Sequence, residues 1–325
     1  MNAATNRKLN FYAGPSTLPL PVLEKLRDSM VDYCGEGMSL IETSHRSSMY
    51  DDVHEGATSL LKELLGVPDN FDVLLLGGGA TLQFAMIPMN LLPAGQSCDF
   101  VVSGSWAKKA LDDARKVGKA NVIFDGADGG YSSLPASISC NPDAAYVHVT
   151  SNETIDGVQW QELPKSGGVP LVVDMSSDIM SRRFSFDDIG AVYAGAQKNL
   201  GPAGVAVVIV RKDLLERSPT TLPAYLNYSV HASKNSLYNT PPVFSIYALK
   251  LVLEHVKGYG GIEAAKEISQ HRSGLIYDVI DASDGFYRCK VERSKRSKMN
   301  LVFNLATEEL EKRFLVAAEA AGMVG

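Results

Sequence analysis

Cysteine is scarce in this chain of 325 residues, and the few cysteines lie far apart. They are Cys34, Cys98, Cys140 and Cys289, and none has the close spacing of a metal-ligand motif. We therefore expect neither a disulfide framework nor a cysteine-rich metal site. Because thiols stay reduced inside the cell, we predict a cytoplasmic protein.

Three further absences narrow the class of protein. No apolar run approaches the roughly 18 residues of a membrane-spanning helix, so no membrane partner is expected. Residues 1–10 are too polar for a signal peptide. The 31 basic residues are outnumbered by 37 acidic ones, and the net charge of −6 gives no sign of a general nucleic-acid surface.

The chain does contain enough apolar residues, at 45%, to bury a sizeable core. Strand-like and helix-like periodicity alternate along most of its length. The predicted strands are 72–76, 99–102, 121–124, 145–149, 169–173, 190–194 and 205–210, and the helices between them include 80–92 and 105–117. This alternation is typical of an α/β fold, so we predict a mostly parallel seven-stranded sheet flanked by helices. The gap before 205–210 is too short for a crossover helix, which predicts an antiparallel strand there.

Beyond Pro241-Pro242 the pattern changes to two long helices and a smaller α+β unit. The helices are predicted at 243–257, 261–282 and 308–321, and the strands at 286–291 and 299–305. We therefore divide the chain into three parts: an N-terminal arm at 1–15, a large domain at 16–258 and a small C-terminal domain at 259–325.

The stretch from Ala191 to Gly204 carries the strongest chemical signal. An apolar run leads to Lys198, and a Gly-Pro-Ala-Gly turn separates it from the next apolar run. Lysine is rarely buried without a reason, and burial lowers its pKa and exposes a nucleophilic amine. Such an amine suits an enzyme that forms a Schiff base. A surface lysine in a loop between strands is the alternative.

Asp174 ends the predicted strand 169–173. Ligands of open parallel sheets bind at the carboxyl ends of the strands. A lysine and a carboxylate at neighbouring strand ends suit pyridoxal phosphate (PLP), with the lysine attached to the cofactor and the aspartate paired with the pyridinium nitrogen. Taken alone, an aspartate at this place is more often a helix cap or a turn residue.

Other segments could hold the same cofactor. Gly77-Gly78-Gly79 precedes a helix whose N-terminus would favour phosphate. Trp106 follows a similar turn and could stack on a flat ring, although core packing is its commoner fate. Thr154 could donate a hydrogen bond to a ring oxygen, and Asn239-Thr240 could bind phosphate, but both segments also suit turns.

Two basic segments remain. His45-Arg46 lies in a polar loop, where arginine could bind carboxylate or phosphate in bidentate fashion or serve solubility alone. Between Arg288 and Lys298, six basic residues occur with only Glu292 against them. This pattern favours a solvated hairpin over a site for an anionic partner.

These residues lie in motifs that resemble the phosphoserine aminotransferase family, in the fold-type I, class V group of PLP enzymes. The matching segments, in chain order, are Asn10-Phe11 through Pro15, Ser44-His45-Arg46-Ser47, Gly78-Gly79-Ala80-Thr81 with Gln83-Phe84, Ser105-Trp106, Asn152-Glu153-Thr154-Ile155-Asp156-Gly157, Asp174-Met175-Ser176-Ser177, Gln197-Lys198-Asn199 with Gly201-Pro202-Ala203-Gly204, Asn239-Thr240-Pro241-Pro242, and Arg296-Ser297 with Met299-Asn300. Together they cover nearly the whole chain.

The resemblance implies transfer of the amino group of L-glutamate to 3-phosphohydroxypyruvate in serine biosynthesis, or to the analogous substrate of the vitamin B6 pathway. It implies these roles: Lys198 as the Schiff-base lysine, Asp174 as the pyridinium partner, Trp106 stacked on the ring, Thr154 bonded to the ring oxygen, Ala80, Thr81 and Gln197 on the cofactor phosphate, and His45 and Arg46 on the anionic end of the substrate. It also implies a homodimer with shared sites, in which Asn239 and Thr240 reach the phosphate of the other subunit's cofactor.

The resemblance further implies a segment after the last predicted helix, with an arginine that clamps the substrate α-carboxylate. The chain stops at Gly325. We therefore expect an incomplete small domain, retained PLP binding and weak glutamate affinity. The alternatives in function are another class V enzyme, such as an alanine–glyoxylate transaminase, or a PLP-binding protein without turnover. A desulfurase is disfavoured because no cysteine sits in an evident active-site loop.

Overall fold

The computed structural model describes residues 7–325, and one seven-stranded sheet forms its centre. The strand order is β2-β8-β7-β6-β5-β3-β4. The strands are β2 (Phe71–Gly77), β3 (Ser97–Val102), β4 (Lys119–Asp125), β5 (Val147–Thr150), β6 (Leu171–Asp174), β7 (Ile189–Gly195) and β8 (Val205–Arg211). All pairs from β7 to β4 are parallel, whereas β8 is antiparallel to both of its neighbours. The predicted fold class and the predicted antiparallel strand are confirmed.

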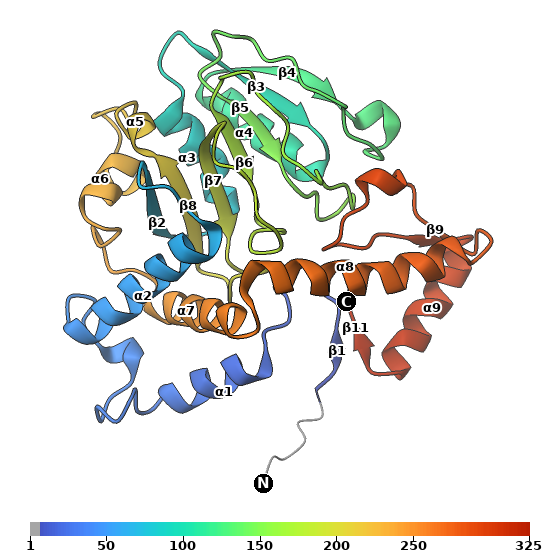
Figure 1. Cartoon of the computed structure of the whole chain (residues 1–325), viewed down its shortest axis with the longest axis horizontal. Helices are drawn as coiled ribbons and strands as arrows, with labels where there is room; N and C mark the ends of the chain where they lie inside the picture. The colour runs from blue at the N-terminus through green and yellow to red at the C-terminus, as the bar shows by residue number, and fades with distance from the viewer. Residues whose placement is uncertain (1–6) are drawn as a thin grey trace.

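Helices cover both faces of this sheet. On one face α2 (Ser48–Leu65) packs against α7 (Val243–Gly258), and on the other lie α3 (Ala80–Leu91) and α4 (Ser105–Val117) (Figure 1). Alternate side chains of one strand serve the two cores, because successive residues of a strand point to opposite faces. Leu75 packs with α2 and α7, whereas Leu74 packs with α3 and α4. The central strands are therefore apolar on both faces, which made them visible in the sequence.

A long helix, α8 (Gly261–Asp281), leads from the sheet into a smaller unit (Figure 1). There β9 (Tyr287–Arg288) pairs with β10 (Asn304–Leu305), and β11 (Met323–Val324) follows α9 (Glu308–Ala320). The N-terminal β1 (Leu9–Asn10) pairs in parallel with β11. The remaining helices are α1 (Leu20–Ser29), α5 (Lys212–Leu215) and α6 (Tyr228–Ser233). Nowhere between residues 7 and 325 does a helix have the length and apolar character needed to cross a membrane.

The strands predicted at 286–291 and 299–305 are wrong in extent, since only two residues of each are paired as β9 and β10. The residues between them bond to the large domain instead. The backbone of Gln159 donates to the carbonyl of Lys295 at 2.9 Å, and Val158 forms a bridge with Arg296. The segment between the two predicted strands is therefore held by backbone hydrogen bonds to a loop of the central sheet and is not a free hairpin turn.

Candidate active site

Three predicted site residues meet at the carboxyl edge of the parallel strands. Asp174 is the last residue of β6, Lys198 follows β7, and Thr154 lies in the loop after β5. The Lys198 Nζ donates a hydrogen bond to the Thr154 Oγ1. Both side chains line a cavity of about 720 Å³, a size typical of ligand sites.

The turn after Lys198 depends on glycine. Gly201 and Gly204 have φ angles of 152° and 120°, where other residues are strained. A Cβ at Gly204 would lie 2.8 Å from the Ser245 Oγ on α7. The turn thus packs tightly on α7 and holds Lys198 at the end of a fully buried strand.

Burial governs the charges of the reacting pair. Asp174 is 4% exposed, and burial raises the pKa of its carboxyl group, opposed by hydrogen bonding from Ser176 and by the charge of Lys198. Burial lowers the pKa of the Lys198 amine, opposed by the charges of Asp174 and Glu153. The result is a more readily neutralised amine beside a carboxylate that would be stabilised by a further cation.

Two carboxylates from the loop after β5 hold the start of α4. The Ser105 N–H donates to Asp156 at 2.9 Å, and the N–H groups of Trp106 and Ala107 donate to Glu153 at 2.9 and 3.0 Å. These donors have no partner within the helix, and the helix dipole favours negative charge there. Trp106 is fixed as a consequence, with its ring centroid 5.6 Å from the Lys198 Nζ.

Glu153 makes the stability of this helix start depend on pH. It is fully buried and also accepts from the Ser103 Oγ at 3.1 Å, and burial raises its pKa to about 7. A raised carboxyl pKa means that the folded state binds a proton more tightly than the unfolded state. The contribution of this group to the free energy of unfolding therefore falls as pH rises through the interval from the unfolded pKa to about 7.

For Glu153→Gln we expect this dependence to vanish. Relative to the parent, the free energy of unfolding of the variant should rise by roughly 2–3 kcal/mol between about pH 5 and pH 8. Urea denaturation at several pH values measures the difference. Ser103→Ala, which removes a donor but keeps the carboxyl group, should retain the parental slope. A constant difference between Glu153→Gln and the parent would contradict the assignment.

The predicted phosphate residues lie beside a glycine. α3 begins at Ala80, and a Cβ added to Gly195 would lie 3.2 Å from the Ala80 nitrogen and 2.5 Å from the Gln197 Oε1. The glycine thus leaves room around a helix N-terminus, where N–H groups favour phosphate. Thr81, the next residue of the helix, is exposed.

The chain's residues fit the cofactor that the resemblance implies. Lys198 offers an amine, Asp174 a buried carboxylate, and Gly195 space beside a helix N-terminus. Trp106 offers an aromatic face next to the amine, and its buried Nε1 has no hydrogen-bond partner among residues 7–325. All four groups lie at one edge of the sheet.

Two predicted pairs do not line the cavity. His45-Arg46 precedes α2, and Arg46 is exposed. Asn239-Thr240 precedes α7, and Thr240 is exposed. The role expected for Asn239-Thr240 concerns a partner subunit, which a single chain does not contain.

Several cavity residues had no role assigned from the sequence. Phe11, Tyr12 and Ala13 of the N-terminal arm line it, and a Cβ at Gly14 would lie 3.1 Å from the Lys198 Cγ. In the sequence, Gly14 was the one indication of this contact, because only a residue without a side chain allows so close an approach. Asn300 also lines the cavity and accepts from the Asn152 Nδ2 at 2.8 Å.

Known proteins are similar to this chain over nearly its whole length. The family model "Aminotransferase class-V" matches residues 8–325. The phosphoserine aminotransferase of Lysinibacillus sphaericus is 50% identical over 323 residues, which is 99% of this chain and 89% of that protein. The solved phosphoserine aminotransferase of Bacillus circulans subsp. alkalophilus superposes with a TM-score of 0.96 at 50% identity, over 98% of this chain and 89% of that one.

A more distant structure bears on the cofactor. A PLP-bound phosphoserine aminotransferase from Trichomonas vaginalis superposes with a TM-score of 0.93 at 32% identity, covering 98% of this chain and 91% of that chain. The match thus extends across the large sheet, the loops with Lys198 and Asp174, and the smaller unit. The chain belongs to the class-V aminotransferases and, within them, to the phosphoserine aminotransferase family.

Proposed function

We propose that this chain transfers the amino group of L-glutamate to 3-phosphohydroxypyruvate, giving O-phospho-L-serine and 2-oxoglutarate. The observation that carries the proposal is the pair of Lys198 and Asp174 at neighbouring strand ends, in a chain 50% identical to a phosphoserine aminotransferase over 323 residues. Bound PLP supplies a ring that takes up electrons from the substrate carbon.

Each residue of the pair has a defined task. Lys198 would hold the cofactor covalently and, once released from it, carry a proton to and from the substrate carbon. The lowered pKa of its amine favours both tasks, because the neutral amine is the nucleophile and the base. Asp174 would keep the ring nitrogen protonated. Trp106 would stack on the ring, and the Thr154 hydroxyl would bond the ring oxygen.

Other residues would bind the phosphate of the cofactor and the anionic end of the substrate. Ala80 and Thr81, at the start of α3, and the Gln197 side chain would hold the cofactor phosphate through N–H and hydroxyl donors. His45 and Arg46 would bind the anionic end of the substrate, for which the guanidinium offers bidentate hydrogen bonds.

The proposal includes a homodimer. Asn239 and Thr240 lie away from the cavity of their own chain and Thr240 is exposed, which supports a role toward the partner subunit's cofactor phosphate. We also retain the division into an arm at 1–15, a large domain at 16–258 and a small domain at 259–325. The start of α8 at Gly261 supports its second boundary. Four free cysteines support the cytoplasmic location.

A mixing experiment tests the shared site. An Asn239→Ala/Thr240→Ala chain and a Lys198→Ala chain are each expected to be poorly active alone. In a heterodimer, the site with the intact lysine receives the native Asn239-Thr240 pair from the other chain. We expect activity to reappear on mixing, up to the level of one site per dimer. Heterodimers proven by mass spectrometry but without activity would place the pair within its own subunit's site.

A direct assay tests the reaction. The amino-acid products are quantified by chromatography: O-phospho-L-serine from L-glutamate and 3-phosphohydroxypyruvate, and glycine from L-alanine and glyoxylate as the matched control pair. We expect turnover with the first pair and much less with the second. Bleaching of the visible cofactor band by glutamate alone distinguishes an enzyme from a PLP-binding protein. A preference for alanine and glyoxylate would overturn the substrate assignment.

A further inference from the structure

A second cavity, of about 330 Å³, lies outside the site described above. Its walls come from the loop after β5, the loop after β6, one face of α8 and Lys298. Lys298 directly precedes Met299 and Asn300, which line the larger cavity. Neighbouring residues of one short segment thus line the two cavities.

Positive charge converges on this second cavity. Four cationic side chains line it, namely Arg182, Arg183, Lys266 and Lys298, against the single carboxylate of Glu162. The Nε of Arg183 is engaged by the Glu263 carboxylate at 2.8 Å. Neither Lys266 nor Lys298 forms an ion pair with any residue in the described part of the chain.

Arg182 is held rigidly at the cavity wall. Its Nη2 donates to the Asp178 Oδ2 at 3.1 Å and its Nη1 to the Gln161 carbonyl at 2.8 Å, and its side chain is 13% exposed. The buried Nε keeps no hydrogen-bond partner among residues 7–325. A planar guanidinium fixed at two positions is preorganised to bind an anion at low entropic cost.

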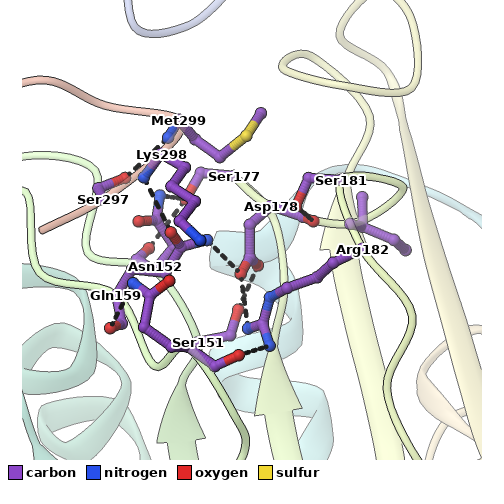
Figure 2. Close-up of polar contacts among 12 residues, drawn as sticks. Ser151, Asn152, Gln159, Ser177, Asp178, Ser181, Arg182, Ser297, Lys298 and Met299 are labelled. Carbon is purple, nitrogen blue, oxygen red and sulfur yellow. Dashed lines mark hydrogen bonds and ion pairs between the residues drawn. The ribbon is translucent and has the colours of Figure 1, made fainter. Parts of the chain in front are cut away.

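The carboxylate that pairs with Arg182 is already occupied by other donors. Asp178 is fully buried and also accepts from the Ser151 Oγ and from the Gln159 Nε2, the latter at 3.1 Å. Figure 2 shows Arg182 and Lys298 on opposite sides of this carboxylate. The other end of Gln159 accepts from the Lys298 backbone N–H at 2.9 Å, so the network also fixes the backbone of Lys298.

The environment of Lys298 favours binding of an anion. Burial lowers the pKa of its ammonium group, and the charges of Arg182 and Lys266 lower it further. Like charges gathered in a partly buried cavity repel one another, and an anion between them would remove that repulsion.

We propose that this cavity binds the phosphate group of a small phosphomonoester between Lys266, Lys298 and Arg182. A phosphate dianion accepts several charge-assisted hydrogen bonds and matches the surplus of cations. The volume is at the small end of ligand cavities, which suits a three-carbon phosphomonoester better than a nucleotide. The site is separate from the phosphate cradle at Ala80 and from His45-Arg46.

Calorimetric titration of the PLP-loaded protein with glycerol 3-phosphate at low ionic strength tests the proposal. We expect a binding event that weakens at least tenfold in Lys266→Gln/Lys298→Gln. Lys312→Gln, an exposed lysine on α9, is the matched control and should bind as the parent does. Inorganic phosphate is the second probe: weaker binding than glycerol 3-phosphate supports a phosphomonoester, whereas equal affinity assigns the cavity to free phosphate.

Crystals of the loaded protein soaked in tungstate locate the anion independently. Anomalous density between Arg182, Lys266 and Lys298 is the expected result. Unchanged affinity in the double lysine variant with a parental melting temperature, or tungstate found only in the larger cavity, would overturn the proposal.

Discussion

Replacing Lys198 by alanine is expected to abolish covalent attachment of the cofactor. The Lys198 Nζ is the amine beside Thr154 and Asp174, and its lowered pKa favours the nucleophilic form. Without it, borohydride should trap no protein-bound cofactor, and turnover should fall by roughly 10⁴-fold or more, because the proton carrier is lost as well. Mass spectrometry after reduction and the glutamate assay measure the two effects.

Lys109 provides the control for this prediction. Its Nζ lies 4.2 Å from the centroid of the same Trp106 ring, closer than the 5.6 Å of the Lys198 Nζ, but Lys109 is exposed and forms no ion pair with any residue between 7 and 325. Lys109→Ala should therefore keep the reducible adduct. An adduct of normal yield on Lys198→Ala, with circular dichroism like that of the parent, would show that another amine holds the cofactor.

The second large effect is expected from Asp174→Asn. The carboxylate is buried at the end of β6, and a neutral amide of the same shape cannot hold the ring nitrogen protonated. The barrier to proton removal from the substrate should rise by about 4 kcal/mol, which is about a 10³-fold loss of kcat. The visible band of the bound cofactor should also shift, because the protonation of the ring changes.

Asp174→Glu separates charge from position. It restores the carboxylate with one extra methylene group in a packed site, so we expect partial recovery of kcat. The glutamate KM of the asparagine variant should change far less than its kcat, since the carboxylate acts on the ring and not on substrate binding. A kcat within tenfold of the parent for Asp174→Asn would refute the role.

The sheet was predictable because burial on two faces leaves a simple pattern. β6 and β7 are buried along their whole length, and the shared carboxyl edge of such parallel strands places Asp174 and Lys198 together without any knowledge of packing. The role of Glu153 could not be predicted in this way. Its function as the cap of α4 depends on a contact across 47 residues with Trp106, and no local periodicity encodes that contact.

The smaller unit was less predictable for a related reason. Apolar residues at 286–291 and 299–305 indicated two full strands, but the intervening backbone bonds to Val158 and Gln159 of the large domain. Tertiary pairing overrode local propensity there. The second cavity was also hidden, because Arg182 and Lys266 are distant in sequence from the basic run that ends at Lys298.

The antiparallel position of β8 bears on how the chain is made. β2 pairs in the sheet only with β8, so Phe71–Gly77 must wait for Val205–Arg211 to emerge from the ribosome. Until then, β2 is an apolar strand with both hydrogen-bonding edges open, the kind of segment that pairs with other chains. Strands β3 to β7 can assemble meanwhile, since each finds its neighbour among them. We expect the nascent chain to be most prone to aggregation, and most dependent on chaperones, after β2 has been synthesised and before β8 has.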